Sequence, residues 1–123
     1  MANILIVDDE APVRQLLRAI LERAGHDVGE ATDGEDGVRR YCERPADLVI
    51  VDILMPKKGG LSTIKDIRAQ FPQARFLAMS GSGKDGKLNF LATARTFHGV
   101  QTIRKPFRQG EVLGAVSRLM ESV

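Results

Sequence analysis

The sequence predicts an α/β fold: a doubly wound parallel sheet of five strands, with five helices distributed over its two faces. Short apolar runs alternate with segments of helical spacing, five times along the chain. The clearest runs are rich in β-branched residues and continuously apolar, which is typical of strands buried on both faces. A chain of 123 residues suits one domain. With right-handed crossovers, we expect the flavodoxin-like strand order 2-1-3-4-5.

The first half of the chain opens on a clear strand, "NILIV" (3–7). In the helix that follows, Pro12 suits the first turn and Gly25 suits the position just after the end. Its apolar residues recur at helical spacing and are Val13, Leu16, Leu17, Ile20, Leu21 and Ala24. "HDVGEA" (26–31) is a weaker strand candidate, and a second helix is expected over 34–44.

The second half repeats the alternation of strand and helix three times. "DLVIV" (47–51) and "RFLAM" (75–79) are clear strands, whereas "GVQTI" (99–103) is a weaker one. The three helices are expected at about 60–70, 86–97 and 108–121. Together with the first half, this order places a crossover helix between successive strands, as a parallel sheet requires.

Reactive side chains follow four of the predicted strands. They are Asp8, Asp9 and Glu10 after the first strand, Asp52 after the third, Ser80 after the fourth and Lys105 after the fifth. In such sheets the carboxyl ends of the strands share one edge, so these groups should converge there. Clustered carboxylates repel one another and favour a hard divalent cation such as Mg²⁺. The set suits phosphoryl transfer onto an aspartate, which gives an acyl phosphate.

Each of these residues also has an ordinary structural interpretation. Asp8 and Asp9 could cap the following helix, and Asp52 could be a turn residue. Ser80 could cap a helix, and Lys105 could be a solvated loop lysine. The combination favours a site, because four separate strand ends supply the right chemical type at the edge where ligands bind.

Four segments carry a resemblance to a known family. They are "ILIVDDE" (4–10), "DLVIVDILMPKKGG" (47–60), "LAMSG" (77–81) and "RKPF" (104–107). With them, essentially the whole chain resembles the receiver domain of a two-component response regulator, similar to the single-domain chemotaxis type. The specific feature is the joint order of an acidic pair, D-x-x-x-P, a serine and K-P.

The resemblance implies a magnesium site at the acidic pair. Asp8 and Asp9 match the residues that bind Mg²⁺ in the family, with Asp9 as the direct ligand. Asp52 matches the phosphoacceptor, which also contacts the metal. The main-chain carbonyl of Leu54 matches a further contribution from the protein.

The resemblance also implies how the phosphoryl group is held and where it comes from. Lys105 matches the lysine that contacts the acceptor and then the phosphoryl group, and Ser80 matches the hydroxyl that engages it. Pro106 matches a proline often preceded by a cis bond. The donor would be the phosphohistidine of a sensor histidine kinase or a histidine phosphotransfer protein. The response would change the surface of the fourth helix, fifth strand and fifth helix, which would meet a downstream protein target.

Two positions depart from the family pattern. Thr102 stands where relatives often carry an aromatic residue that moves with the switch. The segment between Ser80 and Lys105 is about three residues longer than in a compact receiver. Its glycine-rich start, "MSGSGKDGK" (79–87), is not a P-loop, because that motif would need other residues than Ala78 and Asp85. We expect this loop to become ordered when Ser80 engages the phosphoryl group.

Two other functions are compatible with the predicted sheet. A Mg²⁺-dependent phosphohydrolase with an aspartyl phosphate would usually carry a second aspartate two residues after the nucleophile, where this chain has Leu54. Nucleotide or flavin binding is a second alternative that the fold alone does not exclude. The strand-end residues favour a phosphorylatable switch, a phosphoacceptor and not an enzyme, over both.

Composition narrows the classes of partner. The net charge is only +2, and the basic residues of the second half are scattered without interleaved aromatic residues, so direct nucleic-acid binding is not expected. No apolar run reaches the roughly 18 residues of a membrane span. The single cysteine, Cys42, and the absence of a signal peptide fit the cytoplasm. We expect residues 1–123 to form a single receiver domain without an output domain.

Overall fold

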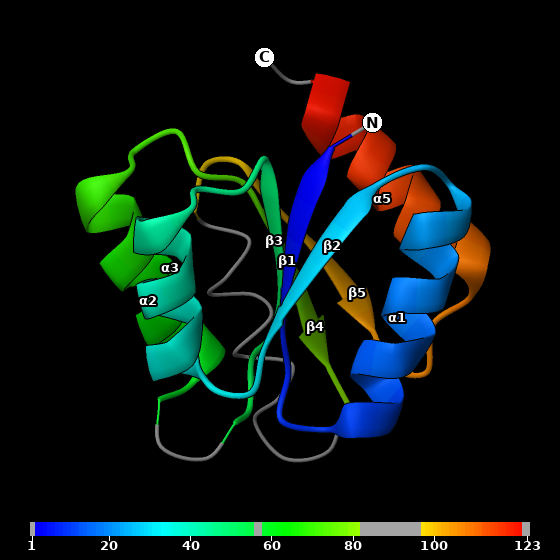
Figure 1. Cartoon of the computed structure of the whole chain (residues 1–123), viewed down its shortest axis with the longest axis horizontal. Helices are drawn as coiled ribbons and strands as arrows, with labels where there is room; N and C mark the ends of the chain where they lie inside the picture. The colour runs from blue at the N-terminus through cyan, green and yellow to red at the C-terminus, as the bar shows by residue number, and fades with distance from the viewer. Residues whose placement is uncertain (1, 56–57, 82–96, 122–123) are drawn as a thin grey trace.

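Five parallel strands form a single sheet in the computed structural model, which describes residues 2–55, 58–81 and 97–121 (Figure 1). Their order is β2-β1-β3-β4-β5, so the predicted fold class and strand order are confirmed. The strands are β1 (Asn3–Val7), β2 (Asp27–Ala31), β3 (Leu48–Asp52), β4 (Phe76–Ser80) and β5 (Val100–Arg104). The two weaker sequence candidates, β2 and β5, occupy the two edges of the sheet.

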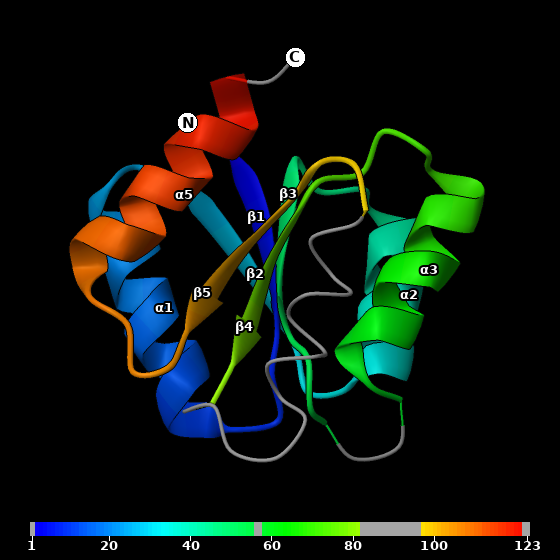
Figure 2. The same cartoon turned by 180° about the vertical axis from the view of Figure 1, so that it is seen from behind.

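Helices cover both faces of the sheet. They are α1 (Ala11–Arg23), α2 (Gly34–Glu43), α3 (Gly60–Gln70) and α5 (Gln109–Glu121). Helices α1 and α5 lie against one face, and α2 and α3 lie against the other (Figure 1 and Figure 2). The helix expected over 86–97 falls almost wholly on residues 82–96, which lie outside the described part of the chain.

Each face of the sheet builds its own core because side chains alternate along a strand. In β1, Ile4 and Ile6 pack into the core under α1 and α5. Leu5 and Val7 pack into the core under α2 and α3. This is why the central strands are apolar at every position, and why their run of letters identified a doubly covered sheet.

Helix α1 follows the predicted boundaries but buries a narrower face than its apolar pattern indicated. A proline lies in its first turn, and Gly25 follows its end with φ +92°, a conformation that favours glycine. Leu17 is fully buried, but Leu16 is 51% exposed. Successive residues of a helix point about 100° apart. Here this rotation turns Leu17 into the core and leaves Leu16 toward solvent, although the adjacent Ile20 and Leu21 are both buried.

Candidate functional site

The register of the sheet brings the predicted site residues to one edge. Val7 pairs with Val51, so Asp8 follows β1 beside the end of β3, where Asp52 lies. Ser80 is the last residue of β4 and pairs with Arg104, the residue before Lys105. The convergence expected from the sequence is therefore a consequence of parallel strands that end at the same level.

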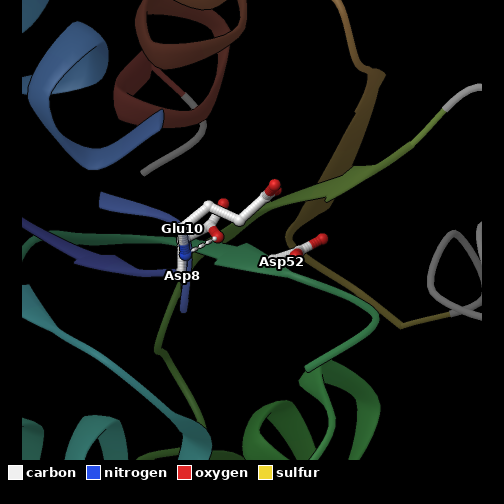
Figure 3. Close-up of side chains that lie close together, drawn as sticks. All are labelled: Asp8, Glu10 and Asp52. Atoms are coloured by element: carbon white, nitrogen blue, oxygen red, sulfur yellow. Dashed lines mark hydrogen bonds between the residues drawn. The ribbon is translucent and has the colours of Figure 1, made fainter. Parts of the chain in front are cut away.

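Three carboxylates gather at this edge. Asp8, Glu10 and Asp52 each offer an oxygen, and these oxygens all lie within 4.8 Å of one another (Figure 3). Asp8 and Asp52 are buried, whereas Glu10 is exposed. Asp9, predicted as the direct metal ligand, is exposed and is not part of this group in the described residues. Within the described residues Glu10, and not Asp9, shares the cluster with Asp8 and Asp52, and the role of Asp9 as a metal ligand stays a prediction.

Two hydrogen bonds hold the Asp8 carboxylate. Its Oδ1 accepts a hydrogen bond from the Glu10 amide at 2.9 Å, drawn as a dashed line in Figure 3. Its Oδ2 accepts one from Lys105 Nζ at 2.9 Å. Burial raises the pKa of Asp8, although these hydrogen bonds act in the opposite direction. The two hydrogen bonds therefore fix the orientation of the Asp8 carboxylate, but they offset only part of the cost of burying its charge.

Asp52, the predicted phosphoacceptor, lies in a similar environment. Its side chain is 7% exposed, and Lys105 Nζ lies 3.4 Å from its Oδ2. Burial and the neighbouring Asp8 charge raise the pKa of Asp52 to about 6, against the attraction of Lys105. The group is thus mainly ionised at neutral pH, but at a cost that a further cation would reduce.

Lys105 is the positive centre of the site. Its ammonium contacts all three carboxylates, with Nζ 2.9 Å from Asp8, 3.0 Å from Glu10 and 3.4 Å from Asp52. Burial alone would lower the pKa of Lys105, but the hydrogen bonds to Asp8 and Glu10 and the charge of Asp52 raise it above its ordinary value. Lys105 therefore remains protonated throughout the physiological pH range.

Ser80 is fully buried at the end of β4, next to this centre. Its carbonyl accepts a hydrogen bond of 2.6 Å from the Lys105 amide, so the two residues are tied together through the main chain. Among the described residues, its hydroxyl donates one long hydrogen bond of 3.4 Å, to the Gly81 carbonyl. The peptide bond between Lys105 and Pro106 is cis, as the resemblance implied.

Some predicted features are only partly visible in the described residues. Leu54 follows β3 and its side chain is exposed, with nothing in the structure that tests its carbonyl as a ligand. Thr102 lies half-buried in β5, opposite Ala78. The expected ordering of the loop after Ser80 concerns residues that lie mostly outside the described part of the chain.

The structure adds Arg14 to the residues that sequence reasoning singled out. It lies on α1, and its guanidinium donates a hydrogen bond of 2.8 Å to the main-chain carbonyl of Asp8. No motif marks Arg14, because its contact depends on the packing of α1 beside β1. Glu10 did have a signal, since it is the third acid of the "DDE" run.

The chemistry of the donor set fits a hard divalent cation such as Mg²⁺. The donors are carboxylate oxygens, which Mg²⁺ prefers. Both buried carboxyl groups, Asp8 and Asp52, have raised pKa values because charge accumulates there away from water. A cation at this edge would relieve that accumulation, so the acidic cluster can bind a metal.

Comparisons with known proteins find similar chains of one family. The family described as response regulator receiver domain matches residues 4–117. The chain is 36% identical to chemotaxis protein CheY of Thermotoga maritima over 120 residues, which span 95% of this chain and 96% of that one. It is also 36% identical to chemotaxis protein CheY of Bacillus subtilis over 121 residues, with 96% and 97% covered.

A solved structure shows the same fold. The receiver domain of NtrX from Brucella abortus superposes with a TM-score of 0.90 at 28% identity, covering 98% of this chain and 99% of that domain. The chain spans only 27% of the longer NtrX chain. In the described residues, no helix has the length and apolar character needed to cross a membrane.

Proposed function

This chain belongs to the response regulator receiver domain family, and from that premise we propose that Asp52 accepts a phosphoryl group from a phosphohistidine. Receiver domains are units of two-component signalling, phosphoacceptors and not classical enzymes, and they imply a histidine kinase partner. The observation that carries the proposal is the position of Asp52. It is a buried carboxylate at the end of β3, 3.4 Å from the Lys105 ammonium and within the acidic cluster.

The proposed donor is a sensor histidine kinase or a histidine phosphotransfer protein. An Asp52 oxygen would attack the phosphorus, and the bond from phosphorus to the donor imidazole nitrogen would break. Asp52 must be ionised to act as the nucleophile, and a pKa of about 6 leaves it so at neutral pH. Lys105 would hold the acceptor carboxylate first and then pair with an oxygen of the transferred group.

We place the metal contacts at Asp8, Asp9, Asp52 and the carbonyl of Leu54. Bound there, Mg²⁺ would supply positive charge against the acceptor carboxylate and the phosphoryl group. Asp8 is suited to this role because two hydrogen bonds already fix its carboxylate. Asp9 is exposed and adjoins Asp8 in the chain, and its role as a direct ligand is what the family resemblance implies.

The proposed signal is a rearrangement around the new charge. Ser80 would engage the phosphoryl group with its hydroxyl, whose one hydrogen bond to the described residues is a long one. Ser80 ends β4 and is bonded to Lys105, which follows β5. A change at these two residues would therefore pass to β5, α5 and the segment before β5, where a downstream protein would bind. The expected cytoplasmic location is part of this proposal and rests on the single cysteine.

The experiment uses a small phosphodonor with the whole chain. Acetyl phosphate and Mg²⁺ should add one phosphoryl group, detected by intact mass and mapped to Asp52 by reductive cleavage. The Asp52→Asn variant should stay unmodified. Stable labelling of another residue, or no labelling of the wild type, would contradict the proposal. Rapid turnover of phosphate esters would instead support the phosphohydrolase alternative. Calorimetric detection of bound nucleotide or flavin would support the alternative of a nucleotide- or flavin-binding protein.

A further inference from the structure

We propose that Arg14, oriented by Glu30, is a positioning residue for the cation site. It would hold the peptide unit between Asp8 and Asp9 in the orientation that the site needs. This inference rests on the proposed function, because it assumes that Mg²⁺ binds at these aspartates. It concerns a residue on α1 that belongs to no motif and that has no direct contact with the carboxylates of the acidic cluster in the described residues.

The first step is the geometry of the Arg14 side chain. Nη1 donates to the main-chain carbonyl of Asp8 at 2.8 Å, and Nε donates to Oε1 of Glu30 at 2.9 Å. The side chain is only 16% exposed. Two hydrogen bonds from different nitrogens of a planar guanidinium fix both its position and its plane. Arg14 therefore links α1, the end of β1 and β2.

The Glu30 carboxylate is held in place by two arginines, Arg14 and Arg18. It lies on β2, and its second oxygen, Oε2, accepts a hydrogen bond of 2.6 Å from Arg18 Nε. The hydrogen bonds from Arg18 and Arg14 hold the pKa of Glu30 below its ordinary value, although burial acts in the opposite direction. Arg18 also pairs with Glu22 on the same helix. Glu30 is thus an anchored carboxylate that presents one oxygen to Arg14.

The second step concerns the main chain at Asp8. Its amide donates to the Ala31 carbonyl of β2 at 3.2 Å, and its carbonyl accepts from Arg14. The carbonyl of Asp8 and the amide of Asp9 belong to the same planar peptide unit. Fixing that carbonyl therefore restricts the plane in which the Asp9 amide lies, and with it the starting direction of the Asp9 side chain.

This restriction matters because, among the described residues, the Asp9 side chain makes no hydrogen bond or ion pair of its own. Asp8 has its carboxylate fixed by Glu10 and Lys105, whereas Asp9 is exposed at the start of the loop. A ligand that is already oriented loses less conformational entropy when the cation binds. Residues that orient metal ligands typically change affinity 10- to 100-fold when replaced. For a single hydrogen bond to the main chain we expect the lower end of this range.

The experiment compares two arginines that share Glu30. Arg14→Gln removes the bond to Asp8, whereas Arg18→Gln removes a Glu30 partner that makes no bond to Asp8 in the described residues. Calorimetric titration of the full chain with Mg²⁺ should show a dissociation constant raised about tenfold for Arg14→Gln. For Arg18→Gln we expect less than about a twofold change, since its loss acts only through Glu30. Equal effects of the two variants, or a wild-type value for Arg14→Gln, would overturn the inference.

A second measurement needs no metal. The ¹⁵N and ¹H resonances of the Asp9 amide should shift in metal-free Arg14→Gln and stay near the wild-type values in Arg18→Gln. This readout keeps the two proposals apart. Wild-type protein that neither binds Mg²⁺ nor takes up phosphate refutes the proposed function, whereas an unshifted Asp9 amide refutes the role of Arg14.

One further variant and one further measurement address folding and mechanism. If Arg14→Gln does not fold, Glu30→Gln replaces it, because it keeps Arg14 but removes the charge that orients it. It should raise the dissociation constant by roughly two- to fivefold, below the range for residues that touch a ligand directly. With acetyl phosphate at saturating Mg²⁺, the rate of phosphorylation of Arg14→Gln should return to near the wild-type value. A rate that stays low at saturation would contradict a role in positioning the cation site.

Discussion

The ammonium of Lys105 lies 2.9 Å from Oδ2 of Asp8, a fully buried carboxylate 97 positions earlier in the chain. Through the same nitrogen, Lys105 also reaches Asp52. The lysine thus supplies the positive charge that two buried carboxylates need when no other cation is bound. Phosphorylation chemistry and stability are therefore coupled at this site, and the coupling can be measured.

Replacement of Lys105 by methionine should destabilise the metal-free protein. It removes the partner of two buried carboxylates, and breaking a buried ion pair on one side typically costs about 3–5 kcal/mol. Urea denaturation in EDTA at pH 7.5 measures this loss. Mg²⁺ should restore part of the lost stability.

The matched control is Lys65→Met, at an exposed position on α3, and it should change stability by less than about 0.5 kcal/mol. Similar losses in both variants would contradict this account of the site.

Asp52→Asn should stabilise the metal-free protein at neutral pH. The pKa of Asp52 is about 6 in the folded protein and about 3.9 in an unfolded chain. Between these values the folded protein binds more protons, so the free energy of unfolding falls as pH rises through this window and stays low above it. Asparagine does not ionise, so the variant keeps the free energy of unfolding that the wild type loses, about 1–3 kcal/mol above pH 7.

The comparison with wild type across pH checks the sign. In EDTA, the stability difference should be largest above pH 7 and should shrink as the pH falls through about 4, because Asp52 becomes protonated in both states below that pH. Asp27→Asn, at an exposed position on β2, serves as the control. A pH-independent difference between wild type and Asp52→Asn would show that the buried charge is not the cause.

Gly60→Ala should disturb both stability and phosphorylation. A Cβ at this position, the start of α3, would overlap the carbonyl oxygen of Asp52 and lie 2.8 Å from Cα of Ile53. Because the obstacle is main chain, the end of β3 must shift, at a cost of about 1–3 kcal/mol. Gly110→Ala in α5 is the control, since a Cβ there meets nothing within 4 Å. It should be neutral or stabilising by up to about 1 kcal/mol. Equal phosphorylation rates in both variants would argue against a shift at Asp52.

The two adjacent leucines of α1 should differ sharply in their contribution to stability. Leu17 is fully buried in the core under α1 and α5, and Leu17→Ala should cost about 2–5 kcal/mol. Leu16 is 51% exposed, and Leu16→Ala should cost less than about 1 kcal/mol. Thermal or urea denaturation of the pair provides the test. A larger loss for Leu16 would mean that α1 is rotated relative to the structure described here.

Much of the architecture could be predicted from local patterns. The continuous apolar runs identified the central strands, because a strand covered on both faces needs apolar side chains at every position. Asp8, Asp52, Ser80 and Lys105 could be assigned to one edge, because parallel strands end together and each of these residues ends or follows a strand. The inner face of α1 was less predictable, since Leu16 and Leu17 are both apolar and only the sheet selects between them.

The sequence by itself determined the strands and the chemical types gathered at their ends, since these depend on spacing and residue type along the chain. The expected strand order came from the handedness of crossover connections in a chain of this length. Only the tertiary structure decided that the Lys105 ammonium pairs with Glu10 as well as with Asp8 and Asp52. The same holds for the hydrogen bond that Arg14 donates to the carbonyl of Asp8. Those contacts depend on the angle and rotation at which α1 packs beside β1 and β2. That angle is set by the summed packing of many side chains and has no signature in any short segment.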